Sequence, residues 1–263
     1  MKNILITRFA IELDSDSRFF ETQEGLEWFS RRIVLFDKTC LPSILSQEVR
    51  PDIWFIFISN NEYLNNELVN LVCNHSFIRV VALGKFEPFK ISVSKLLLRE
   101  NLTKSSTTRL DCDDALHPLY FKSLQHIQSS NTEDFLFEPI DGISVLLKNN
   151  IISRCARIRK QLAPFLSYVN RSGSDIHAFT FEHDKWPHET NKISFKSFPL
   201  WFQIAHDGNI SNAFGWGWMV TRVTEFRPKS IQIFLPSLEI EHRNKIELFF
   251  SNVVNFIKRF KVK

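Results

Sequence analysis

The sequence is poor in glycine, cysteine and methionine. Only 7 of its 263 residues are glycine, and none of them builds the glycine-rich loop that cradles phosphates in many nucleotidyl- and phosphotransferases. The cysteines show no C-x-x-C pair and no spacing typical of a metal site; they are Cys40, Cys73, Cys112 and Cys155. These shortages argue against a P-loop enzyme, a disulfide framework and a zinc-stabilised fold.

Long apolar runs and strong charge are also missing. No segment approaches the roughly 20 apolar residues of a membrane-spanning helix, and the N-terminus lacks the long apolar region and cleavage site of a signal peptide. The formal net charge is only +4, and the basic residues are dispersed, which argues against nucleic acid as a partner. We therefore expect a cytoplasmic protein, or one held at the inner face of the membrane.

The first half of the chain alternates between strand and helix patterns. Hydrophobic residues make up 44% of the sequence, enough for a buried core. Helices are expected at 26–36 and 91–102, and strands at 4–6, 52–59, 78–83 and 107–110. This alternation predicts an α/β fold with a mostly parallel central sheet flanked by helices.

The second half is less regular. Phe135–Glu138 and Ile143–Leu147 are expected to form a hairpin, and further strands are expected at 178–181 and 201–205. A terminal helix is expected at 240–260, followed by a basic end. Such a helix suits contact with an anionic membrane surface, and the alternative is simple packing against the core.

An acidic cluster follows the strand expected at 107–110. Asp111 and Asp113 are separated by one residue, so in an extended turn both carboxylates can face the same point. Mg²⁺ and Mn²⁺ bind carboxylate oxygens and keep positions open for phosphate oxygens. Because ligands of open α/β sheets bind at the carboxyl ends of strands, we expect a divalent cation here. Asp114 is either a third ligand or the cap of a helix that begins near Ala115, and capping is also the alternative for the whole acidic run.

Three blocks of the sequence resemble a known family. They are Thr107 to Pro118, Arg32 to Ser43, and Trp201 to Asn212. Together they resemble the rhamnosyltransferase family of bacterial glycosyltransferases. The resemblance implies a GT-A-like fold with the Asp-x-Asp motif at a strand end, a nucleotide-sugar donor and a metal site that holds Mg²⁺ or Mn²⁺.

The resemblance also implies the reaction class. We expect one glycosyltransferase domain over residues 1–263, with a nucleotide-binding half at 1–120 and an acceptor half with the C-terminal helix at 121–263. The expected reaction is an inverting hexosyl transfer, first of all of a deoxyhexose such as rhamnose, to a hydroxyl of a bacterial polysaccharide or lipid-linked oligosaccharide. A non-catalytic scaffold with this fold and a metal-dependent nucleotidyl- or phosphotransferase remain as alternatives.

Loops after the expected strands supply the other candidate site residues. Members of the GT-A-like class generally complete the metal site with a late histidine, and His206 is the match, so the expected metal ligands are Asp111, Asp113 and His206. We also expect several loop residues to contact the donor; the alternative for each of them is a role in a turn or in packing. The expected donor contacts are Thr7, Arg8, Phe9, Asn60, Arg109, Asp111, Asn209 and Asn212.

The polar loop at 182–188 offers a general base. An inverting transfer needs a carboxylate or imidazole within hydrogen-bond reach of the acceptor hydroxyl. Asp184 is the first candidate, followed by Glu182 and His183. Trp186 would either stack on a sugar ring or pack beneath the loop. The alternative is that the whole loop is a solvated charged segment.

Overall fold

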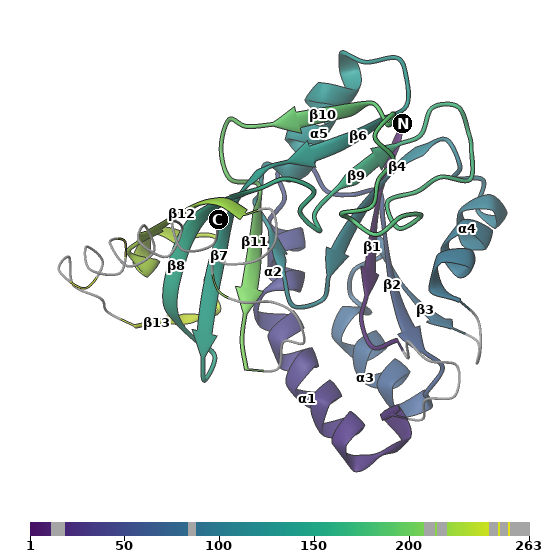
Figure 1. Ribbon diagram of the computed structural model, residues 1–263. Coiled ribbons are helices and arrows are strands. Elements are labelled where there is room, and N and C mark those ends of the chain that lie inside the picture. The colour runs from purple at the N-terminus through teal and green to yellow at the C-terminus, as the bar shows by residue number, and fades with distance from the viewer. Residues whose placement is uncertain are drawn as a thin grey trace.

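The structure is a computed structural model that describes residues 1–11, 19–83, 88–207, 214, 220–241, 247 and 252. Figure 1 shows these residues as two sheets with helices packed around the first of them. The helices of the described part are α1 (Gln23–Lys38), α2 (Cys40–Leu45), α3 (Glu62–Val72), α4 (Phe89–Arg99) and α5 (Tyr120–Ser129), with short 3-10 helices at Phe19–Glu21 and Pro228–Ile231. Of these described helices, none is long and apolar enough to cross a membrane.

The first sheet contains the strands that the first half of the sequence predicts. Strands β4, β1, β2 and β3 are parallel neighbours in that order, which confirms the parallel arrangement expected there. Strand β9 runs antiparallel to both β4 and β6. In spatial order the strands are β10 (Lys192–Phe195), β6 (Phe135–Pro139), β9 (Ser167–Val169), β4 (Ser105–Asp111), β1 (Lys2–Arg8), β2 (Ile53–Ser59) and β3 (Ile78–Leu83).

Helices cover both faces of this sheet, so its central strands are apolar on both sides. Leu5 and Trp54 belong to the core cluster that includes Phe29 of α1. The alternate positions, Ile6 and Phe55, face α4 on the other side. Burial on both faces explains why β2 is a continuous apolar run rather than an alternating one.

The second sheet is mostly antiparallel and lies beside the first (Figure 1). Among its described strands, only β7 with β11 and β8 with β13 pair in parallel. A separate core cluster covers this sheet, built around Val145, Phe202 and Leu235. Its main path is β12 (Val220–Phe226), β8 (Ile151–Lys160), β7 (Asp141–Lys148), β11 (Trp201–Ala205) and β5 (Ala115–Leu116), with β13 (Glu239–Ile240) beside β8.

The hairpin predicted from residues 135–138 and 143–147 is wrong. Strand β6 belongs to the first sheet and β7 to the second, and the chain passes between them at Ile140. Strand β7 instead forms a hairpin with β8. Gly142 allows this crossing because a Cβ atom at that position would lie 2.2 Å from the Trp201 ring.

Three further expectations need correction. Residues 178–181 form a turn, closed by the Thr180 N–H to His177 carbonyl hydrogen bond of 2.9 Å, instead of a strand. Ala115 lies in β5, and the next helix begins only at Tyr120. The helix expected at 91–102 begins and ends earlier, at 89 and 99. Most of the segment expected to form a terminal helix lies outside the described residues.

Candidate functional site

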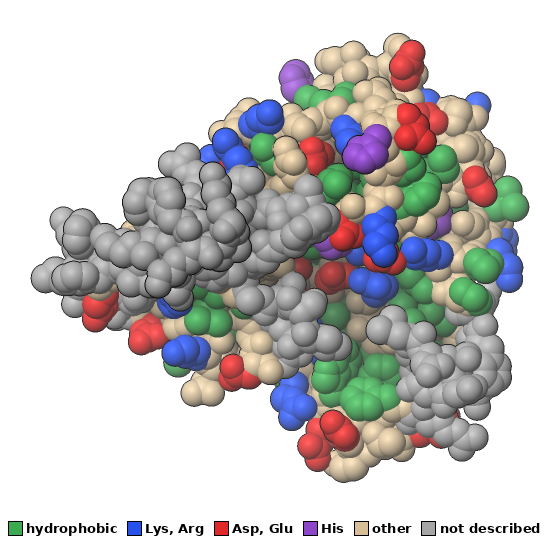
Figure 2. All heavy atoms as spheres, viewed as in Figure 1, with side chains coloured by type: hydrophobic (Ala, Val, Ile, Leu, Met, Phe, Trp, Pro, Cys, Tyr) green, Lys and Arg blue, Asp and Glu red, His purple; other side chains and the backbone are tan. Residues whose placement is uncertain are grey.

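Charged residues meet at the carboxyl end of the first sheet. Arg8 and Asp111 are the last residues of β1 and β4 and are register partners. The Arg8 Nη2 atom lies 3.4 Å from Asp111 Oδ1, and both side chains are about one-third exposed. Basic and acidic side chains also gather near the centre of the face shown in Figure 2. The strand ends thus place a solvent-accessible ion pair where α/β proteins bind their ligands.

Two residues beyond Asp111, the Asp113 carboxylate is buried between two partners. It forms an ion pair with the Arg32 guanidinium, and its Oδ2 atom lies 3.2 Å from Nε2 of His206. Burial opposes ionisation of Asp113, but the hydrogen bond from His206 and the charge of Arg32 outweigh it and lower the pKa of this carboxyl. Asp113 is therefore an anion held by two nitrogen donors.

Arg32 is a site residue that the sequence interpretation missed. It lies in α1, and its guanidinium stacks over the Trp28 ring at 4.7 Å. A signal for it was present, because Arg32 falls between Phe29 and Phe36 on the apolar face of the helix expected at 26–36. A basic residue on such a face requires a buried partner, and that partner is Asp113.

Asp114 links the acidic turn to the second sheet. Its Oδ1 atom accepts the backbone N–H of Ile204 in β11 at 2.8 Å, so the alternative helix-cap role is wrong. Its Oδ2 atom is buried and has no hydrogen-bond partner in the described part of the chain. Burial, together with the charges of Asp113 and Asp111, raises the pKa of Asp114 well above its usual value. Asp114 therefore ionises less readily than an ordinary aspartate.

Arg109 is a buried cation on the same strand as Asp111. Its guanidinium lies over the Phe179 ring at 4.6 Å, but its Nε and Nη1 atoms have no hydrogen-bond partner among the described residues. Burial lowers the pKa of Arg109, and the negative charge of Asp111 partly offsets this effect. A buried guanidinium with unused donors is suited to an anionic ligand.

The loop predicted to carry a general base acts electrostatically on Arg109. The negative charges of Glu182 and Asp184 act on the Arg109 guanidinium and raise its pKa against the effect of burial. Asp184 is half-buried. Glu182 forms a 3.0 Å ion pair with Lys90, whose hydrogen bond lowers the pKa of Glu182. The loop therefore lies within electrostatic range of Arg109, and its catalytic role stays a prediction.

The other two loop residues have clear packing partners. The Nδ1 atom of His183 lies 2.6 Å from the Leu162 carbonyl oxygen, and burial, followed by the charge of Arg109, lowers the pKa of His183. Trp186 is buried and stacks on Tyr168 at 5.4 Å. Trp186 therefore packs beneath the loop, as the packing alternative predicted.

Several predicted donor contacts lie away from the charged residues. Thr7 is fully buried, and its Oγ1 atom accepts the indole N–H of Trp54 at 3.0 Å. Phe9 packs edge-on against the rings of Phe29 and Phe36. Both residues serve the core. Asn60 is exposed just after β2. The predicted contacts Asn209 and Asn212 lie outside the described residues.

The three predicted metal ligands do not form a preassembled metal site. Asp113 and His206 are in contact, but Asp111 faces Arg8. Over the described ranges, no group of three or more His, Cys, Asp and Glu side chains is arranged to hold a metal ion. The cation therefore stays a prediction.

Comparison with solved structures gives distant similarities. "Crystal structure of S. aureus TarS 1-349" aligns with a TM-score of 0.40 and 11% identity, over 78% of this chain and 60% of that chain. The complex of TarS 1-349 with UDP-GlcNAc gives 0.39 and 11% over 80% and 60% of the two chains. The complex with UDP gives 0.39 and 12% over 78% and 61%. The chain thus spans about three-fifths of these TarS structures.

A search of curated protein sequences gave no match. The comparison with protein families, in contrast, identifies a family. The model of a family described as "putative rhamnosyl transferase" matches residues 24–217, a range that includes Arg32, Asp113 and His206. This range is well over half of the chain and agrees with the resemblance noted in the sequence. The protein therefore belongs to the putative rhamnosyl transferase family, a family of glycosyltransferases.

Proposed function

We propose that the protein transfers a sugar from a nucleotide-sugar donor to a hydroxyl group of a bacterial polysaccharide or lipid-linked oligosaccharide. The observation that carries this proposal is the meeting of Arg8, Arg109 and the Arg32–Asp113–His206 group beside one sheet edge. The leaving group of such a transfer is a nucleoside diphosphate, whose negative charge grows as the sugar bond breaks. Preorganised cations at that point stabilise the transition state more than the ground state.

Arg109 is the best-placed cation for the donor diphosphate. Its Nε and Nη1 donors are desolvated and unused in the described structure, so a phosphate would satisfy them without displacing another partner. Arg8 is accessible and already lies at the strand end beside Asp111. The two guanidiniums lie near the same Phe179 ring, at 5.6 Å and 4.6 Å, and we propose that both act on the donor diphosphate.

Mg²⁺ or Mn²⁺ is the cofactor that we propose. Asp111, Asp113 and His206 would hold the ion: the two carboxylates supply the oxygen ligands that Mg²⁺ and Mn²⁺ prefer, and the His206 imidazole would complete the set. The fit is supported by the contact between two of these residues, since Nε2 of His206 lies 3.2 Å from Oδ2 of Asp113. Such an ion supplies Lewis-acid stabilisation of the diphosphate charge. Arg8 contacts the Asp111 carboxylate and Arg32 contacts the Asp113 carboxylate, so these two arginines influence how strongly the ion binds.

The donor sugar that we propose is a deoxyhexose such as rhamnose, carried on dTDP, in keeping with the family. For an inverting transfer, Asp184 is the proposed base that accepts the proton of the acceptor hydroxyl. The electrostatic effect of Asp184 on Arg109 supports this role, because the acceptor must approach the sugar that the donor diphosphate carries.

Calorimetric titration with dTDP and UDP, with and without Mn²⁺, tests the donor site. We expect dTDP to bind only weakly without Mn²⁺, and Asp113→Asn to remove the Mn²⁺ effect. Asp37→Asn is the matched control, because Asp37 is an exposed aspartate of the same helix as Arg32. In parallel, wild-type protein incubated with dTDP-rhamnose and Mn²⁺ should release dTDP slowly. No binding of either nucleotide and no release of dTDP would refute the proposal.

A further inference from the structure

Two arginines from neighbouring strands approach the same buried ring. The Cζ atom of Arg109 lies 4.6 Å from the centroid of the Phe179 ring, and the Cζ atom of Arg8 lies 5.6 Å from it. Both distances are within the roughly 6 Å over which a cation is attracted to an aromatic ring. The ring is only 2% exposed, and this attraction is stronger where water is excluded. Phe179 therefore stabilises two positive charges of the candidate site at once.

The strand register explains why these two cations are close. Arg109 in β4 is the register partner of Ile6 in β1, and Asp111 is the partner of Arg8. Because alternate residues of a strand share a face, both arginines lie on the face of the sheet that packs against α4. Burial lowers the pKa of Arg109 most, and the like charge of Arg8 lowers it further, against the opposite charge of Asp111. Keeping the two guanidiniums together therefore requires compensating groups, and the structure supplies the Asp111 carboxylate and the Phe179 ring.

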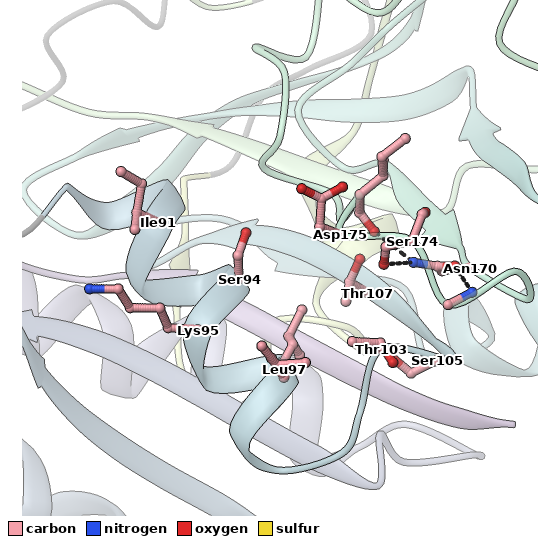
Figure 3. Close-up of a pocket in the computed structure, with 13 residues that line it drawn as sticks. Ile91, Ser94, Lys95, Leu97, Thr103, Ser105, Thr107, Asn170, Ser174 and Asp175 are labelled. Carbon is pink, nitrogen blue, oxygen red and sulfur yellow. Dashed lines mark hydrogen bonds between the residues drawn. The ribbon is translucent and has the colours of Figure 1, made fainter.

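The turn that carries Phe179 is attached to elements on both sides of it. The N–H of Ala178 donates to the Thr107 hydroxyl of β4 at 2.8 Å, and the Phe179 N–H donates to Nδ1 of His177 at 3.2 Å. On the other side, the Ser94 hydroxyl of α4 lies 3.1 Å from Nε2 of His177. Figure 3 labels Ser94 on α4 and Thr107, the two side chains that anchor this turn. Since Thr107 is only two residues from Arg109, the anchor and the cation belong to the same strand.

The ring itself is held by a second aromatic side chain. Phe89, the first residue of α4, packs edge-on against Phe179, with 4.9 Å between the ring centroids and 87° between the ring planes. Phe179 also belongs to the core cluster between this face of the sheet and α4. The position of the ring is therefore set by packing that does not depend on a ligand.

We infer that Phe179 is a positioning residue that holds the Arg8 and Arg109 guanidiniums together as one binding site for a diphosphate. This inference rests on the proposed function, because the diphosphate is that of the nucleotide-sugar donor. The ring has no hydrogen-bonding atom, so it acts on the ligand through the two arginines. Its electron-rich face attracts both guanidiniums. The pair is thus assembled before the ligand arrives, which reduces the cost of ordering the site on binding.

Fluorinated phenylalanine at position 179 tests this inference. Fluorine withdraws electron density from the ring and leaves its size almost unchanged, so it weakens the attraction to cations without removing the packing. The full chain is prepared with 4-fluoro-, 3,5-difluoro- or 3,4,5-trifluorophenylalanine at position 179, and each protein is titrated calorimetrically with inorganic pyrophosphate in the absence of Mn²⁺. We expect saturable binding to the wild type that weakens with each added fluorine, by at least about tenfold in the trifluoro protein. A ring that served packing alone would not produce this order.

The same analogues at Phe137 provide the matched control. Phe137 is fully buried and packs edge-on against Tyr120 at 5.8 Å in a different core cluster, so its fluorination should leave the pyrophosphate affinity unchanged. Phe179→Leu removes the ring but keeps an apolar side chain, and it should bind pyrophosphate no better than the trifluoro protein.

Three results would overturn the inference: no saturable binding of pyrophosphate to the wild type, an affinity that does not depend on the number of fluorines at position 179, or an equal loss when Phe137 is fluorinated. A dTDP titration of the same proteins separates the two proposals. If pyrophosphate follows the fluorine series and dTDP does not bind, the arginine pair is confirmed and the nucleotide-sugar donor is wrong.

Discussion

The Nε2 atom of His206 lies 3.2 Å from Oδ2 of Asp113, although 93 positions separate the two residues in the chain. The backbone explains this approach. The N–H of Ile204 donates to the Asp114 carboxylate at 2.8 Å, so β11 is attached to the acidic turn two residues before His206. The second sheet therefore supplies the histidine, and the first sheet supplies the aspartate.

The first prediction concerns the buried ion pair of Arg32 and Asp113. Arg32→Gln leaves the Asp113 anion buried without its main positive partner, so we expect the free energy of unfolding to fall by roughly 3–5 kcal/mol. In the double variant Arg32→Gln/Asp113→Asn, the loss should be smaller than the two single losses together. Urea unfolding of the four proteins measures the coupling.

Arg31, the residue before Arg32, provides the control for this comparison of single and double variants. Arg31 is exposed on the same helix, and Arg31→Gln should change the free energy of unfolding by no more than about 0.5 kcal/mol. Additive losses in the double variant would show that Arg32 and Asp113 do not stabilise one another.

The second prediction separates stability from ligand binding at Arg109. Arg109→Met removes a buried guanidinium with unused donors, so the free energy of unfolding should not fall below that of the wild type. The affinity for dTDP in Mn²⁺ should fall at least about tenfold, since hydrogen bonds to a charged group are worth about 1.5–3 kcal/mol. Arg99→Met, at an exposed position, should leave the affinity unchanged. A destabilised Arg109→Met protein with normal dTDP affinity would make Arg109 a purely structural residue.

The third prediction tests the general base. Asp184→Asn keeps the size of the side chain but cannot accept the proton, so the transfer rate should fall by about 10²–10⁴-fold. Donor affinity should stay close to that of the wild type, because Asp184 is proposed to face the acceptor. A transfer assay and a dTDP titration on the same preparation distinguish the two effects. If Asp184→Asn transfers at the normal rate, the role passes to Glu182 or His183; if it loses dTDP binding, Asp184 belongs to the donor pocket.

The fourth prediction is a pH dependence of stability. His177 is buried, and burial lowers its pKa from 6.5 to about 4. Between these values the unfolded chain binds a proton that the folded chain does not, so stability falls as the pH decreases from 6.5 towards 4. The loss attributable to His177 should reach about 3 kcal/mol. His177→Gln should flatten this slope in urea unfolding between pH 7 and 4.5, whereas His126→Gln, at an exposed position, should not. Equal slopes in all three proteins would contradict the assignment.

Local patterns in the sequence were sufficient for the first half of the fold. The apolar run that became β2 and the helical spacing of α1 depend on burial of nearby residues, and both elements appear where they were expected. The prediction for the second half of the fold failed at Pro139–Gly142, where a hairpin was expected. Two strands joined by a short polar turn look alike in sequence whether they pair with one another or with strands from distant segments. The partners of β6 are β9 and β10, which lie far along the chain.

The residues of the candidate site likewise fall into those that local sequence patterns predict and those that only the folded structure reveals. Asp111 and Asp113 were found from the sequence because their spacing and their position after a strand are local features. Arg32 was not, since its role depends on a carboxylate that only the packing of α1 against the acidic turn brings to it. The core role of Thr7, which bonds to Trp54, also required the folded sheet. The sequence determined which residues carry charge at the strand ends. Tertiary packing decided which of these charges are buried and paired, because the energy of a buried charge depends on neighbours that the order of residues in the chain does not reveal.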